Sequence, residues 1–193
     1  SDLHVKGVQF RDPTFTIKKD RTAAICRGII ERQLRIEWGC ETRVDCLTED
    51  LIDTMVDAGL KGVNIGIEST DPNVIRNAKR GWIDPARIER MVRHMHERGV
   101  RVSGFFIIGL PGETIDAVRR TLDFALSIPL SYAEFKIATP FPGTPLFDMA
   151  LANKWIDGVE LERYTSYTPT MRIADRKSTR LNSSHSQQSR MPS

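Results

Sequence analysis

The stretch GFFIIGLPGET, at residues 104–114, is an apolar run that breaks abruptly into a turn. The turn contains Gly109, Pro111 and Gly112. Glycine lets the backbone come close to a ligand without a side chain in the way, and proline stiffens the turn. From the turn alone, nucleotide or phosphate binding and a purely structural role are equal alternatives. The stretch is not a P-loop, because no Lys-Ser or Lys-Thr pair follows it.

Outward from this stretch, apolar runs with β-branched residues alternate with helical segments. Successive runs lie roughly 30 to 40 residues apart, the length of a βαβ unit. The runs are HVKGVQF at 4–10, LRIEWGC at 34–40, KGVNIGIES at 61–69, RVSGFFIIG at 101–109 and YAEFKIATP at 132–140. They predict five parallel strands, in an open doubly wound sheet or a (β/α) barrel.

Local chemistry marks the helices between these strands. Asp84 and Pro85 predict an N-cap and a first helical position, and Gly99 predicts the end of that helix. Glu113 and Asp116 are expected in the first turn of the next helix, where the macrodipole favours acids.

Ligands bind at the carboxyl ends of the strands in both architectures, so the residues after each strand are the candidate site residues. The third strand ends in Glu68, Ser69 and Thr70. The first strand leads into Asp12, and the second leads into Glu41, Arg43 and Asp45. The fourth leads into the glycine turn, and the fifth leads into Thr139 and Pro140. Structural roles are the alternatives to ligand binding: Asp12 as a helix cap, and Glu41 and Asp45 as solvated loop acids.

Five motifs in this order resemble the radical S-adenosylmethionine enzymes, especially the branch with an N-terminal cobalamin-binding domain. The motifs, over residues 4–155, are FRDPTFT, WGCETRVD, AGLKGVNIGIES, GFFIIGLPGET and ATPFPGTPL. The resemblance implies an α/β fold, a partial (β/α)6 TIM-like barrel with its first strand missing. It also implies a 4Fe-4S cluster and S-adenosylmethionine at the barrel mouth, with reductive cleavage to a 5′-deoxyadenosyl radical. An upstream domain that binds cobalamin is a further expectation.

The resemblance also implies roles for individual residues. Glu68 and Ser69 would contact the ribose and amino-acid part of S-adenosylmethionine, and Arg80 would pair with its carboxylate. Arg80 is equally a helix-end cation beside Lys79. The adenine would lie against Ile107, Gly109, Pro111 and Gly112, and be enclosed by Thr139 and Pro140. The expected substrate contacts are Arg43, Glu41 and Asp12.

The three cysteines depart from the family pattern. The family binds its cluster through CxxxCxxC, whereas Cys26, Cys40 and Cys46 are separated by 13 and then 5 residues. Neither gap fits a compact iron–sulfur motif. We therefore predict no metal ligand in this chain and expect Cys26 in the core. The first visible strand corresponds to the family's second, so truncation explains the gap better than divergence.

Composition restricts the remaining possibilities. The 193 residues carry a formal net charge of +3, but four bases and no acid lie in 176–193, and without these four, 24 bases face 25 acids. The charge therefore gives no case for binding nucleic acid. No apolar stretch approaches the roughly 20 residues that span a bilayer. An odd cysteine count without a secretory leader suggests a cytoplasmic protein.

We divide the chain into a partial barrel at 1–157, an irregular extension at 158–175 and a disordered, artefactual tail at 176–193. The leading hypothesis is a fragment of a radical enzyme for methyl transfer or carbon-skeleton chemistry, inactive alone. Its partners would be a small-molecule substrate and an electron donor such as a flavodoxin or ferredoxin. The alternatives are a cluster-free module that binds a nucleoside or S-adenosylmethionine, an inactive remnant, and an ordinary TIM-barrel lyase or hydrolase.

Overall fold

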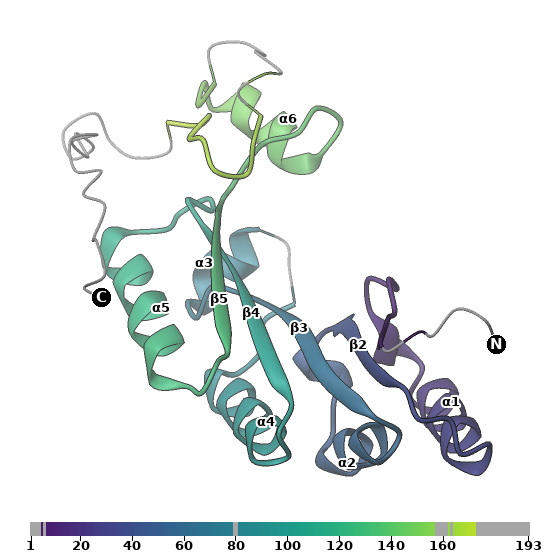
Figure 1. Ribbon diagram of the computed structural model, residues 1–193. Helices are drawn as coiled ribbons and strands as arrows, with labels where there is room; N and C mark the ends of the chain where they lie inside the picture. The colour runs from purple at the N-terminus through teal and green to yellow at the C-terminus, as the bar shows by residue number, and fades with distance from the viewer. Residues whose placement is uncertain (1–4, 6, 79–80, 157–161, 163, 173–193) are drawn as a thin grey trace, which may run out of the picture.

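The computed structural model describes residues 5, 7–78, 81–156, 162 and 164–172. One parallel sheet has the strand order β1-β2-β3-β4-β5, and it does not close (Figure 1). The strands are β1 (Gly7–Gln9), β2 (Glu37–Thr42), β3 (Leu60–Glu68), β4 (Arg101–Ile108) and β5 (Tyr132–Ile137). A doubly wound sheet reverses its strand order at a switch point, and this sheet does not. The prediction of a partial barrel is therefore confirmed.

Helices follow the strands in the alternation that the sequence predicted. They are α1 (Lys19–Glu31), α2 (Glu49–Asp57), α3 (Pro72–Asn77), α4 (Pro85–Glu97), α5 (Ile115–Ser127) and α6 (Pro145–Ala152), with short 3-10 helices η1 (Phe15–Ile17) and η2 (Val44–Cys46). Asp84 caps α4 by accepting from the backbone N–H of Ala86. Thr114 is the N-cap of α5, so Glu113 precedes that helix, and its predicted place in the first turn was wrong.

The strands differ from the predicted runs at their boundaries. The second strand begins at Glu37 instead of Leu34, because Gln33 takes a left-handed φ of 52° and Leu34 is exposed. The last strand ends at Ile137, although the N–H of Ala138 still donates to the carbonyl of Ile108 at 2.8 Å. β1 is only three residues long.

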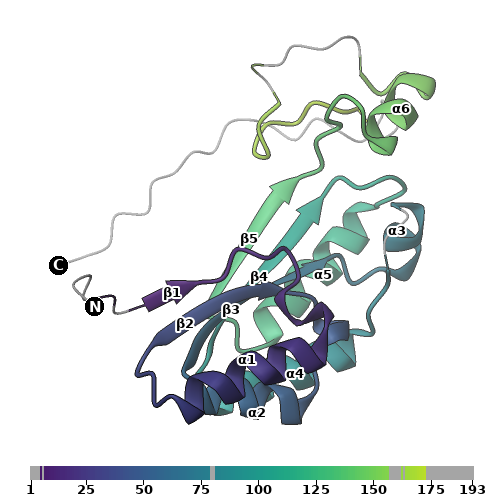
Figure 2. The same ribbon diagram turned by 90° about the vertical axis from the view of Figure 1, so that its right-hand side faces the viewer.

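The two faces of the sheet differ in character. Alternate residues of β3 and β4, including Val63, Ile65 and Phe106, are buried in the core beneath the helices. Figure 2 shows α1, α2 and α4 on the same side of the sheet. The opposite, concave face carries Gly62, Gly66 and the polar side chain of Asn64, all of which are only half-buried. Among the described residues, no helix is long and apolar enough to cross a membrane.

Candidate functional site

A cavity of about 300 Å³ lies where β3 ends. Three predicted site residues line it together: Arg43 from the loop after β2, and Glu68 and Ser69 from the end of β3. Its other lining residues are Gly66, Ile67, Ile75, Gly81 and Ile83. Parallel strands present their carboxyl ends at one edge of a sheet, which is how residues 25 positions apart in the sequence meet here.

The backbone of Glu68 is unusual. Its φ is +68°, a left-handed conformation that a residue with a side chain adopts only at a cost of about 1–2 kcal/mol. The register between β3 and β4 also shifts between Gly66 and Glu68. Backbone strain of this kind concentrates at functional sites. The bulge and the left-handed residue together turn the chain from strand β3 into the loop that bears Ser69.

The loop after β3 is braced by α5. The Thr121 hydroxyl lies 3.4 Å from the Ser69 hydroxyl and accepts from the N–H of Thr70 at 3.2 Å. Arg120, the neighbour of Thr121, forms a 2.7 Å ion pair with Asp71. Asp71 in turn caps α3 through its other carboxylate oxygen. Helix α5 therefore fixes the position of the candidate ligand loop.

The turn after β4 lies beside this loop. The N–H of Glu113 donates to the carbonyl of Leu110 at 3.0 Å, and Gly112 has a φ of +80°. Pro111 and Gly112 therefore occupy the central positions of a type II turn. A Cβ added to Gly112 would lie 2.6 Å from the side-chain amide nitrogen of Asn77. The close packing of Asn77 therefore explains why this position is a glycine. Of the two turn glycines, Gly109, at φ +83°, is the one whose added Cβ would meet nothing within 4 Å, so it leaves room for a ligand.

Glu113 holds the turn in place. Its carboxylate accepts from the N–H of Gly109 at 2.6 Å and also hydrogen-bonds with the N–H of Leu110 and the hydroxyl of Ser69. Burial raises the pKa of Glu113 above its usual value, and these hydrogen bonds oppose the rise. The sequence interpretation missed this role. The feature of the sequence that points to this role is a carboxylate placed directly after a Pro-Gly turn.

Arg43 is held by a neighbouring acid. Its guanidinium makes two contacts with the Asp45 carboxylate, Nε to Oδ1 at 3.0 Å and Nη2 to Oδ2 at 2.7 Å. This hydrogen bonding raises the pKa of Arg43 and lowers that of Asp45. The side chain of Arg43 is 51% exposed, so it remains accessible from the cavity.

The other predicted contacts for adenine lie on β4 and β5. Ile107 is half-buried and is paired in register with Lys136 of β5. The Thr139 hydroxyl donates to the carbonyl of Ile137 at 3.0 Å, and Pro140 is buried. These residues follow the same edge of the sheet as Glu68 and Gly109, and their roles remain predictions.

Two of the predicted site residues, Asp12 and Glu41, do not line this cavity. Asp12 pairs with Arg21 of α1 at 3.3 Å, and Glu41 on β2 pairs with Arg11 at the same distance. The alternative role of Asp12 as a helix cap was wrong, because neither η1 nor α1 has a side-chain cap. Arg80 lies outside the described residues.

The described cysteines do not form a cluster site. Cys26 and Cys40 are fully buried, as expected for Cys26, and burial raises their pKa values to about 11 and about 12. Cluster ligands are thiolates, and these thiols resist ionisation. In the part of the chain that the structure describes, no three His, Cys, Asp or Glu side chains are placed to hold a metal ion.

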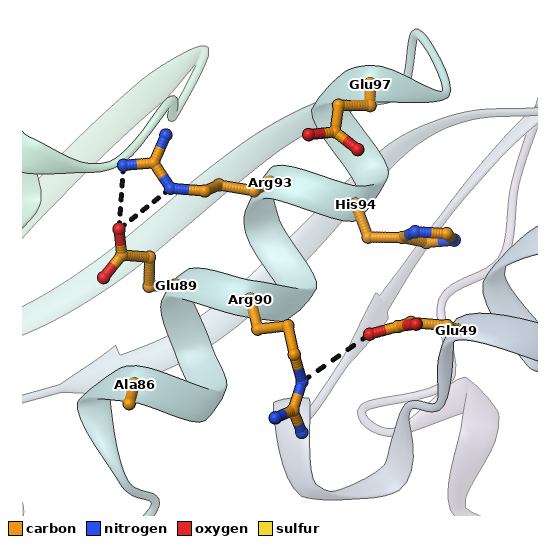
Figure 3. A pocket seen from close by; sticks show the side chains of 7 residues that line it. All are labelled: Glu49, Ala86, Glu89, Arg90, Arg93, His94 and Glu97. Carbon is orange, nitrogen blue, oxygen red and sulfur yellow. Dashed lines mark hydrogen bonds and ion pairs between the residues drawn. The ribbon is translucent and has the colours of Figure 1, made fainter.

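A larger groove, of about 460 Å³, lies between α2 and α4 (Figure 3). Its charged side chains neutralise one another: Arg93 pairs with Glu89 at 2.8 Å and Arg90 with Glu49 at 3.6 Å. The groove lies in the outer helical layer, away from the strand ends. Its side chains therefore form a solvated surface network, and we do not assign a site to it.

Comparisons with known proteins identify relatives by sequence. The family model of the Radical SAM superfamily matches residues 3–125. An uncharacterized methyltransferase of Pyrococcus horikoshii is 35% identical over 88% of this chain and 37% of its own length. The bacteriochlorophyllide d C-12(1)-methyltransferase of Chlorobaculum tepidum is 25% identical over 72% of this chain and 30% of its own length. The chain thus spans about a third of the length of these relatives.

Solved structures share the fold. The methyltransferase TsrM from Kitasatospora setae, solved with cobalamin and a 4Fe-4S cluster, superposes with a TM-score of 0.70 at 22% identity. The match covers 80% of this chain and 32% of that protein. Elp3 from Methanocaldococcus infernus superposes with a TM-score of 0.60 at 17% identity, over 79% of this chain and 42% of that protein.

Proposed function

The chain belongs to the radical SAM superfamily, and we propose that it forms the S-adenosylmethionine-binding part of an enzyme that cleaves this molecule reductively. One observation carries the proposal: Arg43, Glu68 and Ser69 share a cavity, and Glu113 ties Ser69 to the open backbone at Gly109. A nucleoside with a charged tail needs such a combination of polar side chains and accessible backbone.

The residues present fit S-adenosylmethionine. The absent Cβ of Gly109 leaves open space beside the half-buried Ile107, where an adenine ring would lie. Glu68 and Ser69 would take the hydroxyl and ammonium groups, and Arg43 would offer its charge to the carboxylate. When bound, S-adenosylmethionine supplies the methyl or radical equivalent for the reaction. The chain's own residues bind and orient it.

The residues described here do not fit a 4Fe-4S cluster, since two of the three thiols are buried with raised pKa values. We therefore assign no step to a cluster held by this chain. In the proposal, the parent enzyme supplies the cluster from outside these residues, together with cobalamin, which the TsrM structure contains. An electron donor such as a flavodoxin or ferredoxin and a small-molecule substrate complete the proposal.

Methyl transfer is the reaction that the relatives favour, because the two relatives described above carry that activity in their names. Ring closure is the second candidate reaction. A relative from Rubrivivax gelatinosus, 28% identical over 81% of this chain, is an anaerobic magnesium-protoporphyrin IX monomethyl ester cyclase. The alternative function is a cluster-free module that binds S-adenosylmethionine or a nucleoside, which the lack of a metal site among the described residues favours.

Nuclear magnetic resonance titration of the chain with S-adenosylhomocysteine tests the proposed site. We expect saturable shifts at Ser69, Ile107 and Gly109, and none in the groove between α2 and α4. Guanosine, which presents a different purine edge, is the control ligand. Shifts confined to the α2–α4 groove, or equal affinity for guanosine, would refute the assignment.

The coding sequence directly upstream of Ser1 separates the two functions. An in-frame CxxxCxxC segment would support the radical enzyme. A nearby in-frame start without these cysteines would support the binding module.

A further inference from the structure

The concave face of the sheet holds a second cavity, of about 350 Å³, at the amino ends of β4 and β5. Its lining residues are Gln9, Gly62, Val63, Asn64, Arg101, Ser103, Ser131 and Tyr132. Arg101 and Tyr132 are the first residues of their strands, whereas Glu68 is the last residue of β3. This cavity therefore lies at the opposite end of the barrel strands from the cavity of Arg43 and Glu68.

The strand register places three polar side chains in one row. Asn64 of β3 is paired with Ser103 of β4, and Ser103 is paired with Tyr132 of β5. Paired residues of parallel strands face the same side of a sheet, and neighbouring strands lie roughly 4.8 Å apart. The row therefore spans about 10 Å, the size of a small molecule.

Gly62 lines this cavity and leaves its floor open, and Gly39 on the neighbouring strand β2 makes room for the side chain of Gln9. A Cβ added to Gly39 would lie 2.6 Å from Oε1 of Gln9, so the amide of Gln9 extends across β2 toward the cavity. A Cβ added to Gly62 would meet only the carbonyl oxygen of Arg101, at 3.9 Å. A larger side chain at Gly62 would fill the space that a ligand needs.

The charge of the cavity is positive. Among the described residues that line it, Arg101 is the only charged one. On the same face, Glu41 contacts Arg11 at 3.3 Å and Glu134 contacts Lys136 at 3.5 Å, and the exposed Glu37 at the start of β2 is not part of the cavity lining. Arg101 therefore sets the local field, and hydroxyl and amide donors surround it.

We infer that this cavity binds an oxyanion group, a carboxylate or a phosphate, on a small polar substrate. Arg101 supplies the charge, and Asn64, Ser103 and Tyr132 donate hydrogen bonds. The inference rests on the proposed function, because it assigns the cavity to the substrate of the same barrel. It predicts that the substrate carries its anionic group on the end farther from Gly109.

Titration of the full chain with three probes, followed by nuclear magnetic resonance, tests the inference. Succinate and inorganic phosphate represent the two oxyanion types, and succinamide is the neutral analogue of succinate. We expect at least one oxyanion to shift the signals of Gln9, Asn64 and Ser103, and succinamide to bind at least tenfold more weakly. The stronger of the two anions identifies the substrate's anionic group.

Three variants make the test specific to the cavity. Arg101→Gln is expected to weaken anion binding at least tenfold, and Gly62→Leu is expected to do the same by filling the space while Arg101 stays. Lys61→Gln removes one exposed positive charge beside the cavity, and we expect its affinity to stay within twofold of the original. Circular dichroism melts establish that each variant is folded.

The outcomes separate this inference from the proposed function. Equal affinity of the original chain and Arg101→Gln, or of succinate and succinamide, would overturn the oxyanion site. If neither anion binds while S-adenosylhomocysteine does, the inference is wrong and the proposed function stands. If the anions bind through Arg101 while S-adenosylhomocysteine does not, the cavity stands as an oxyanion site and the proposed function fails.

Discussion

The backbone N–H of Gly109 donates to the Glu113 carboxylate at 2.6 Å. The same carboxylate hydrogen-bonds with the hydroxyl of Ser69, so one side chain holds the turn after β4 against the loop after β3. Both segments carry candidate ligand residues. Their relative position therefore depends on a residue that need not touch the ligand itself.

Replacing Glu113 by Gln should destabilise the fold and weaken ligand binding. The amide has one acceptor oxygen for three donors, so we expect a loss of about 1–2 kcal/mol in unfolding free energy. Urea unfolding measures this loss. Binding of S-adenosylhomocysteine should weaken with it, because Gly109 and Ser69 lose their common anchor. A variant as stable as the original would contradict the bracing role.

The pH dependence of stability provides a second test at Glu113. Burial raises its folded pKa above the ordinary value of 4.5. The stability contributed by this group is therefore full below about pH 4.5 and is lost as the pH rises through the folded pKa. The stability difference between the original chain and Glu113→Gln should fall over that interval in urea titrations. Parallel curves of stability against pH for the two proteins would contradict the raised pKa of Glu113.

Gly109→Ala and Gly99→Ala form a matched pair. Both glycines have a positive φ, and an added Cβ at either meets nothing within 4 Å. Each substitution should therefore cost about 1 kcal/mol of stability through backbone strain. Only Gly109→Ala should weaken binding of S-adenosylhomocysteine, by roughly tenfold or more, or about 1.4 kcal/mol. Equal binding by the two variants would exclude Gly109 from the ligand contact.

The sequence predicted those features that short-range patterns determine. The alternation of apolar runs predicted a parallel sheet, and Asp84 caps the helix that follows it, as predicted. The same pattern also predicted that Glu68 and the Gly109 turn would lie at the strand ends. These features depend on residues within a few positions of one another or on one βαβ repeat.

Features that depend on distant residues were not predictable in the same way. Glu113 hydrogen-bonds with Ser69, which is 44 positions away in the sequence. Asp12 forms an ion pair with Arg21 and does not cap a helix. Such pairings are decided by how the helices pack on the sheet, which one sequence does not specify. The cavity around Arg101 was missed for the same reason, since its lining comes from β1, β3, β4 and β5.

Arg43→Gln should weaken binding of S-adenosylhomocysteine at least tenfold while changing stability little. The Arg43–Asp45 pair is 51% and 42% exposed, and exposed pairs contribute about 0–1 kcal/mol. Arg93→Gln is the matched control, because Arg93 has a similarly exposed pair with Glu89 in the α4 surface network. Calorimetry compares the two variants, and equal affinities would remove Arg43 from the site.

Thr121→Val tests whether the brace from α5 positions the ligand loop. Thr121 is 2% exposed, and valine keeps its shape but removes the hydroxyl that accepts from the N–H of Thr70. Leaving a buried donor unpaired should cost about 1–3 kcal/mol in unfolding free energy. Thr54→Val, which removes a hydroxyl bonded only to the carbonyl of Asp50 in its own helix, should cost less. Because the brace orders Ser69, Thr121→Val should also weaken S-adenosylhomocysteine binding, whereas Thr54→Val should not. Unchanged binding in a destabilised Thr121→Val protein would mean that the brace serves the fold alone.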